Sequence, residues 1–185
     1  MAENSLDALA LIEIDSIARG YSVMDGLAKR ARVTVKWAKP VTPGKFIILF
    51  AGEIASAEEA MLAAQEIAGT HLLGTMFLPQ VHSELLAALA GNHSQREMAA
   101  VAVVELSHVW STLEGADLAL KAAEVGLIQM TLAAGIGGKG YFVLVGEHAD
   151  ILAAHDAIKG SDLLESLIAI EVIANPQPDI CGFFK

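Results

Sequence analysis

The chain has little cysteine and few aromatic residues, and it has no long apolar run. Its 185 residues include one cysteine, Cys181, so no internal disulfide can form, and this fits a reducing compartment. The longest uncharged stretch, residues 67–83, contains two histidines and a proline, and no segment offers the roughly 18 continuous apolar residues of a membrane helix. The N-terminus is acidic and lacks the basic start of a signal peptide. We therefore expect a cytoplasmic protein with no membrane partner.

Positive charge is also scarce. The sequence has 12 Lys and Arg against 22 Asp and Glu, a net charge of −10. A nucleic-acid partner is not expected, because phosphate contacts need clustered Lys and Arg, and the one basic cluster, residues 29–32, is typical of a helix end. In contrast, 54% of the residues are hydrophobic. We expect so apolar a chain to bury part of its surface against other copies of itself.

The arrangements that carry catalysis or bind metals are missing as well. The histidines show no His-x-x-x-His spacing and none pairs with a cysteine, while His148 and His155 share a helical face without a third ligand. Ser161 precedes Asp162, but there is no Gly-x-Ser-x-Gly motif. The sequence therefore predicts no enzyme activity, no cofactor and no metal site.

A glycine-rich stretch at residues 135–140 fits the letters of a dinucleotide-binding loop, Gly-x-Gly-x-x-Gly. That fingerprint must open a helix, whereas residues 141–145, Tyr-Phe-Val-Leu-Val, are typical of a strand. A P-loop does not fit either, because Ala133 and Gly140 stand where it needs a glycine and a Ser or Thr. We expect these glycines to bend a loop between two strands.

An internal repeat organises the chain. Charged and glycine landmarks recur in the same order about 92 to 94 residues later: Glu13 as Glu105, Asp25 and Lys29 as Asp117 and Lys121, Gly44-Lys45 as Gly138-Lys139, and Gly52-Glu53 as Gly146-Glu147. The polar run 91–97 joins the two copies. We expect an N-terminal tail at 1–8, a first domain at 9–91, a linker at 92–98 and a second domain at 99–185. Glu13 and Glu105 lie within apolar runs, and their shared repeat position favours a structural partner over catalysis.

Each repeat has the same predicted plan. The first contains, in order, a strand at 9–15, a helix at 22–32, a strand at 33–38, a loop at 40–44, a strand at 45–52, a helix capped by Ser56 and ending at Gly69, a strand at 72–78 and a short helix at 83–89. The second repeat follows this order with a shorter late helix. The fold class is α/β (an α+β sandwich), with a roughly four-stranded sheet and packed helices in each domain. Each domain buries little core alone, so further packing is expected.

Three motifs in this order, doubled along the chain, resemble the bacterial microcompartment shell domain: Ile-Ala-Arg-Gly at 17–20, Pro-Gly-Lys-Phe at 43–46 and Gly-Ile-Gly-Gly-Lys at 135–139. The resemblance extends from about residue 9 to residue 184 and is to the tandem-domain type. It implies a structural shell protein whose homotrimer is a pseudohexameric disc. Such discs tile a shell facet beside other shell proteins, hexamers and pentamers, and carry a central pore for small metabolites or cofactors.

The resemblance also assigns roles to residues. The matching pore-lining positions are Val41, Thr42, Pro43 and Gly44 in the first repeat and Ile136, Gly137 and Gly138 in the second. Lys29 and Lys121 match the edge lysine that meets a neighbouring disc. Gln80 and Asn175 stand where the family often has an arginine, so lateral contacts would be weaker or differently made.

Thr42 argues against one alternative, a shell protein that carries a redox centre. One branch of tandem shell proteins has a cysteine at this position, and three such cysteines hold an iron–sulfur cluster on the trimer axis. A threonine hydroxyl does not replace the thiolate of such clusters, so we expect a polar constriction and no redox centre. Two further alternatives are a pseudo-symmetric sensor that binds a small ligand between its repeats and, weakest, an enzyme with its site between them.

Overall fold

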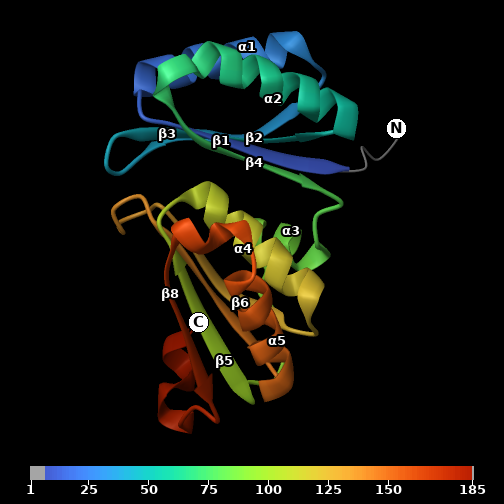
Figure 1. Ribbon diagram of the computed structural model, residues 1–185, viewed down its shortest axis with the longest axis vertical. Helices are drawn as coiled ribbons and strands as arrows, with labels where there is room; N and C mark the ends of the chain where they lie inside the picture. Colours follow the sequence, from blue (N-terminus) through green and yellow to red (C-terminus); the bar gives the residue numbers. More distant parts are fainter. Residues whose placement is uncertain (1–6, 185) are drawn as a thin grey trace. The chain divides into compact units, whose positions relative to one another are not determined.

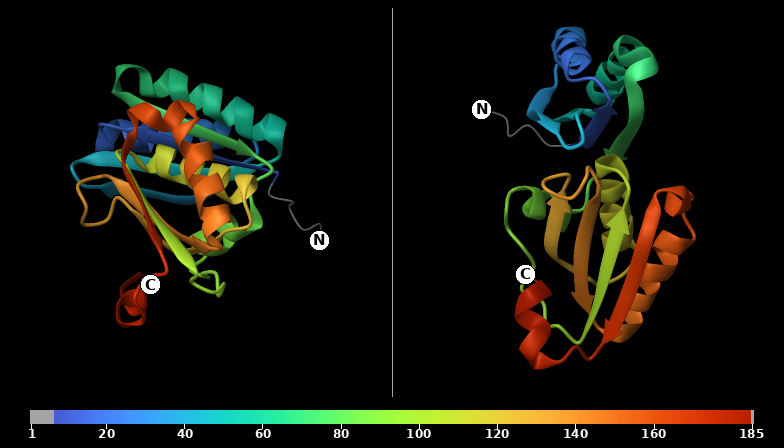
Figure 2. Two further views of the ribbon diagram at one scale, coloured as in Figure 1. Left: turned by 60° about the horizontal axis from the view of Figure 1, so that its bottom comes forward. Right: turned by 90° about the vertical axis from the view of Figure 1, so that its left-hand side faces the viewer.

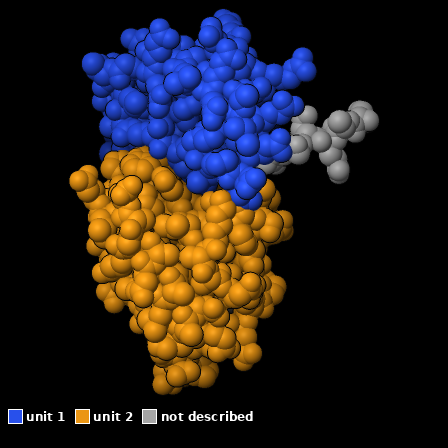
Figure 3. Space-filling model, turned by 45° about the vertical axis from the view of Figure 1, so that its right-hand side comes forward, with its two compact units in different colours: residues 1–81 blue, residues 82–185 orange. Residues whose placement is uncertain are grey.

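A computed structural model describes residues 7–184, which divide into two compact units, unit 1 up to Val81 and unit 2 from His82 onward (Figure 3). Each unit has a four-stranded antiparallel sheet with two long helices on one face (Figures 1 and 2). No helix within residues 7–184 is long and apolar enough to cross a membrane. The predicted fold class is confirmed.

Unit 1 follows the predicted element order. Its elements are β1 (Ala8–Ile14), α1 (Ile17–Arg30), β2 (Thr34–Val41), β3 (Lys45–Gly52), α2 (Ile54–Ala68), the 3-10 turn η1 (Gly69–His71) and β4 (Leu72–Pro79). The strands lie in the order β2-β3-β1-β4. β1 is buried along its whole length, as its nearly continuous apolar sequence dictates for a central strand.

Both long helices of unit 1 begin differently from the prediction. α1 begins at Ile17, five residues before the predicted start, because the Ser16 hydroxyl caps it by accepting the Arg19 N–H at 3.3 Å. The glycine at position 20 does not break this helix. α2 begins at Ile54 without a side-chain cap, so the capping role predicted for Ser56, which lies inside the helix, is wrong.

Unit 2 repeats this arrangement. It contains α3 (Ser83–Leu89), β5 (Ala100–Leu106), α4 (Val109–Ala122), β6 (Gly126–Leu132), β7 (Gly140–Gly146), α5 (His148–Lys159), β8 (Leu167–Ala174) and the 3-10 helices η2 (Asp162–Glu165) and η3 (Pro178–Phe184). The strand order β6-β7-β5-β8 matches that of unit 1. The sequence groups α3 with the first repeat, but in the structure α3 packs against α4 and β6 and lies in unit 2.

The two sheets agree in register as well as in order. Val35 faces Phe50 across β2 and β3, and Leu127 faces Leu144 across β6 and β7. Each of these edge strands then shifts register directly after that position. Val35 and Leu127 are therefore equivalent positions, and this equivalence extends the repeat beyond what the sequence landmarks alone identify.

Candidate functional site

The loop between β2 and β3 is a tight turn over residues 41–44. The Gly44 N–H donates to the Val41 carbonyl at 2.9 Å, and the Thr42–Pro43 peptide is cis. Gly44 has a φ of 103°, a region that disfavours any side chain, although a Cβ there would meet no atom within 4 Å. The turn thus needs glycine for its backbone conformation. Thr42, Pro43 and Gly44 are all exposed, so the Thr42 hydroxyl is accessible to solvent.

The loop between β6 and β7 is longer and richer in glycine. Its base is closed by the Ala133 N–H, which donates to the Lys139 carbonyl at 2.8 Å. Gly135, Gly137 and Gly138 have φ values of 73°, 69° and 81°. The chain then enters β7, so the prediction that these glycines bend a strand-to-strand loop is confirmed. Of the expected pore residues in this loop, Gly137 is exposed, Ile136 half-buried and Gly138 buried.

A lysine at the end of each loop reaches back to the central strand. Lys45 Nζ lies 2.7 Å from an oxygen of the fully buried Glu13. In unit 2, Lys139 Nζ lies 3.1 Å from Glu105 in a pair that stays partly exposed. The structural partner predicted for the two glutamates is confirmed. Sequence reasoning missed that the partner is the lysine, although Gly-Lys recurs at this point in both repeats.

The two expected edge lysines differ in their surroundings. Lys29 pairs with Asp25 at 2.6 Å, and both side chains are well exposed. Lys121 pairs with Asp117 at 2.5 Å, but Asp117 is nearly buried and also accepts the His82 N–H at 2.8 Å. The aspartate of this pair is therefore exposed in unit 1 and buried in unit 2, while the lysine keeps solvent access in both.

The expected edge residues Gln80 and Asn175 share an unusual backbone. Their φ values are 54° and 47°, in the left-handed region, which Asn tolerates better than most residues. The Gln80 N–H donates to the Asp7 carbonyl at 2.9 Å, and the Asn175 N–H donates to the Ala99 carbonyl at 3.0 Å. Both residues are exposed, at the same turn after the last strand of each sheet.

Titratable groups do not gather into a reactive cluster within residues 7–184. No group of three or more His, Cys, Asp and Glu side chains there could hold a metal ion. The carboxyl of Glu114 on α4 has a raised pKa, chiefly because it is partly buried and then because Asp162 and Asp117 are close. This carboxyl lies apart from both loops in the sequence.

Two α/β units of one topology, each with a glycine turn between its second and third strands, define a tandem-domain α/β protein. The family model described as the BMC domain matches the chain twice, at residues 8–81 and 100–176. The chain therefore belongs to the BMC-domain family and is a bacterial microcompartment shell protein with tandem BMC domains. Proteins of this kind are structural and not enzymes, and this one takes its place in the microcompartment shell.

Relatives support the assignment over most of the chain. The sequence is 34% identical over 144 residues, 78% of each chain, to the bacterial microcompartment shell protein PduT of Citrobacter freundii. A microcompartment protein from Desulfitobacterium hafniense DCB superposes with a TM-score of 0.81 and 30% identity, over 94% of this chain and 97% of that one. The fused permuted hexameric shell protein of the RMM microcompartment shares the fold, with a TM-score of 0.63 and 21% identity over 86% of this chain and 85% of that one.

Proposed function

We propose that three copies of the chain form a pseudohexameric disc that tiles into the shell facet, with a central pore for small metabolites or cofactors. The observation that carries the proposal is the repetition of one glycine turn at the same topological place in both units. Three chains in a closed ring with threefold symmetry supply six such units, two from each chain.

The pore would be lined by Val41, Thr42, Pro43 and Gly44 in one loop and by Ile136, Gly137 and Gly138 in the other. Thr42 supplies a hydroxyl that donates and accepts hydrogen bonds, so three copies form a polar ring that a hydrated metabolite can cross. Backbone amides of glycines at positive φ can also meet an anion. Because Thr42 offers no thiolate, the loop does not suit an iron–sulfur cluster.

The rim of the disc would use the residues at the other end of each unit. Lys29 and Lys121 would meet neighbouring discs and the hexamers or pentamers beside them, with Gln80 and Asn175 at the turn where an arginine is common. In isolation Lys29 is the more accessible of the two lysines, since its side chain is 74% exposed against 41% for Lys121. The edge formed by unit 1 therefore presents a more accessible lysine than the edge formed by unit 2.

The test is the mass and shape of the purified protein. Sedimentation at micromolar concentration should give three times the chain mass of 19.4 kDa. Negative-stain electron microscopy at high concentration should show threefold discs in hexagonal sheets. A stable monomer at micromolar concentration would contradict the proposal, whereas discs that never tile would contradict only the edge roles.

A further inference from the structure

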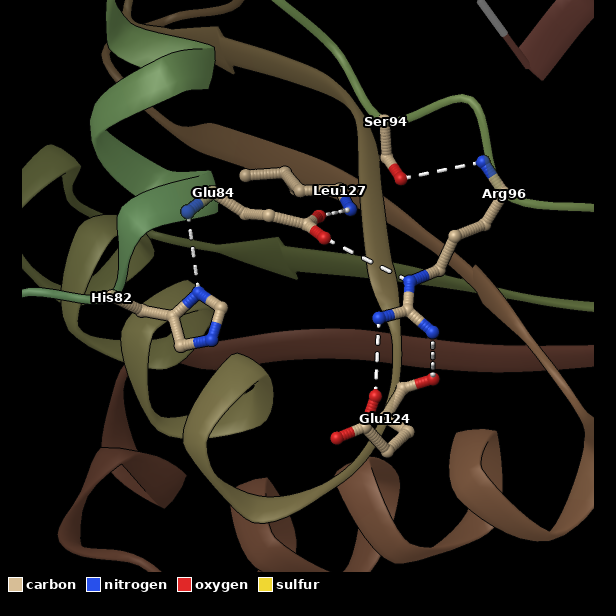
Figure 4. Close-up of polar contacts among 6 residues, drawn as sticks. All are labelled: His82, Glu84, Ser94, Arg96, Glu124 and Leu127. Atoms are coloured by element: carbon tan, nitrogen blue, oxygen red, sulfur yellow. Dashed lines mark hydrogen bonds and ion pairs between the residues drawn. The ribbon is translucent and has the colours of Figure 1, made fainter.

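The short helix α3 packs against a defined surface of its own unit, formed by β6 and α4, which we call its seat. Its Glu84 carboxylate accepts the Leu127 N–H of edge strand β6 at 3.0 Å (Figure 4). Just before the helix, the His82 N–H donates to Asp117 of α4. Leu85 is fully buried. The helix thus covers both the outer edge of β6 and one side of α4.

The segment after α3 completes this seat. Arg96 lies between two carboxylates, with Nε 3.8 Å from Glu84 and Nη2 3.1 Å from Glu124 (Figure 4). The Ser94 N–H donates to the Leu127 carbonyl at 2.9 Å. Both backbone polar groups of Leu127 are therefore satisfied, which closes an edge that would otherwise be open.

The second repeat ends in a counterpart of α3, namely η3. After the left-handed Asn175, as after Gln80, a short helix begins three residues later. The first turns match, because the Leu85 N–H donates to the His82 carbonyl and the Ile180 N–H donates to the Gln177 carbonyl. Residues 83–89 thus correspond to residues 178–184.

The apolar residues of the two helices differ in exposure. Leu85 and Ala88 are 0% and 9% exposed in α3, whereas their counterparts Ile180 and Phe183 are 41% and 84% exposed in η3. An exposed Phe beside an exposed Ile is an apolar patch without a cover in this chain.

In unit 1, the surface of α1 that is equivalent to the α3-binding surface of α4 is exposed. On α4, Val109, Leu113 and Asp117 lie at i, i+4 and i+8 and are buried. Their equivalents on α1 are well exposed, Ile17 at 40%, Tyr21 at 55% and the Asp25 side chain at 61%. The same spacing places these three residues in one row on the helix.

The equivalent positions at the two seats carry opposite charges, Glu124 in unit 2 and Arg32 in unit 1. Glu124 and Arg32 are equivalent, since each follows the Ala that ends its helix, Ala123 and Ala31. In unit 2, Arg96 forms ion pairs with the two acids Glu84 and Glu124. In unit 1 the seat itself carries the exposed cation Arg32, and the counterpart of Glu84 on η3 is the acid Asp179.

We propose that η3 of one copy docks on unit 1 of a second copy, as α3 docks within unit 2. Ile180 and Phe183 pack against Ile17 and Tyr21, and Asp179 pairs with Arg32 at the edge of β2. The occupant is a second copy because each chain carries both the helix and the seat. Such a head-to-tail contact forms a ring when the rotation between copies closes, as the proposed threefold disc requires. The inference rests on the proposed trimer and deepens it by naming the contact that joins the copies.

A cross-link tests the contact directly. Arg32→Cys and Asp179→Cys are combined in a Cys181→Ser background and treated with a short bifunctional thiol reagent. We expect bands of two and three linked chains on a denaturing gel. A matched control replaces Asp179→Cys with Asp156→Cys, whose side chain on α5 is 80% exposed, and should remain a single band. Absence of interchain bands in the test variant, or an intrachain link alone, would overturn the proposal.

A second variant separates this inference from the proposed assembly. Phe183→Asp should raise the dissociation constant of the trimer about tenfold or more, because a buried aromatic contact is lost. Leu152→Asp makes the same kind of change at an exposed apolar residue of α5, 41% exposed, and should leave the dissociation constant unchanged. A monomeric wild type would overturn the trimer itself. A trimeric wild type with an equally stable Phe183→Asp trimer would overturn only the docking of η3.

Discussion

Gly20 and Phe46 in unit 1 occupy the positions of Thr112 and Gly140 in unit 2. A Cβ on Gly20 would lie 2.4 Å from the Phe46 ring, and a Cβ on Gly140 would lie 2.3 Å from the Thr112 hydroxyl oxygen. Each unit therefore sets a glycine against a side chain at this helix–strand contact, with the glycine on the helix in unit 1 and on the strand in unit 2. A close helix–strand approach is kept in both units, although the filling side chain comes from the strand in unit 1 and from the helix in unit 2.

This contact predicts the effect of Gly20→Ala. The free energy of unfolding should fall by about 1–3 kcal/mol, because the new methyl group overlaps a buried ring. Denaturant unfolding measures the change. The matched control is Gly115→Ala inside α4, where a Cβ would make ordinary contacts at 3.5 Å or more. It should be neutral or stabilise by up to about 1 kcal/mol. Equal effects of the two substitutions would show that the close approach at Gly20 does not matter.

The raised pKa of Glu114 predicts a pH dependence. Burial and the nearby Asp162 and Asp117 disfavour its charged form in the folded state. The folded protein thus binds more protons than the unfolded chain in this range, so stability falls as the pH rises from the usual glutamate value through the folded pKa, and the loss persists at neutral pH.

Glu114→Gln should therefore raise the melting temperature at neutral pH, with an advantage that shrinks as the pH is lowered toward the usual glutamate pKa. Thermal melts across this range measure it. Glu58→Gln on the exposed face of α2 is the control and should show no such trend. An advantage independent of pH would contradict the proposed cause.

At the scale of elements, a lysine at the end of each loop forms an ion pair with a glutamate of the central strand. The two ion pairs differ in burial. Glu13 is fully buried next to Lys45, whereas the pair of Glu105 and Lys139 is partly exposed. A buried carboxylate that loses its cation costs far more than an exposed one.

Lys45→Met should accordingly lower the free energy of unfolding by about 3 kcal/mol. Lys139→Met at the equivalent position should cost at most about 1 kcal/mol. Chemical denaturation of both variants measures the difference. Adding Glu13→Gln to Lys45→Met should recover part of the loss. If the two lysine variants were equally stable, burial would not control the strength of these pairs.

Most elements were predictable because their signals are local. The apolar run of residues 8–14 and the strand signal after Gly140 identify their strands directly. The predicted start of α1 at residue 22 excluded Gly20, and the reason for glycine there is the Phe46 ring, which is distant in sequence. The partner of Glu13 was missed for the same reason, since Lys45 is 32 residues away. The packing of α3 depends on tertiary contacts with α4 and β6, and no local sequence pattern predicts these contacts.

For the whole molecule, the sequence predicted the doubled domain correctly, because landmarks such as Asp25 and Lys29 recur in order. The pore-lining and edge residues remain predictions, since they concern contacts between copies. The pore prediction rests on convergence, because identical loops of a symmetric ring can meet only on its symmetry axis.

Thr42→Cys in a Cys181→Ser background tests that convergence. If the β2–β3 loops meet at the axis, a short bifunctional thiol reagent should link two chains of each trimer and leave the third thiol unpaired. A denaturing gel should show dimers as the largest main product. Asp156→Cys in the same background should stay a single band. A Thr42→Cys trimer that never cross-links would place the loops away from the axis.

The reversed pair at Gly20 and Phe46 has a consequence for the gene. Tandem duplications are prone to recombination between their copies, which yields chains with exchanged segments. A product with the helix of Thr112 and the strand of Phe46 would place two large groups in one volume, while the opposite product would face Gly20 with Gly140 across a void. We therefore expect either exchanged chain to be less stable than the parent, so the helix and the strand at this contact can change only together.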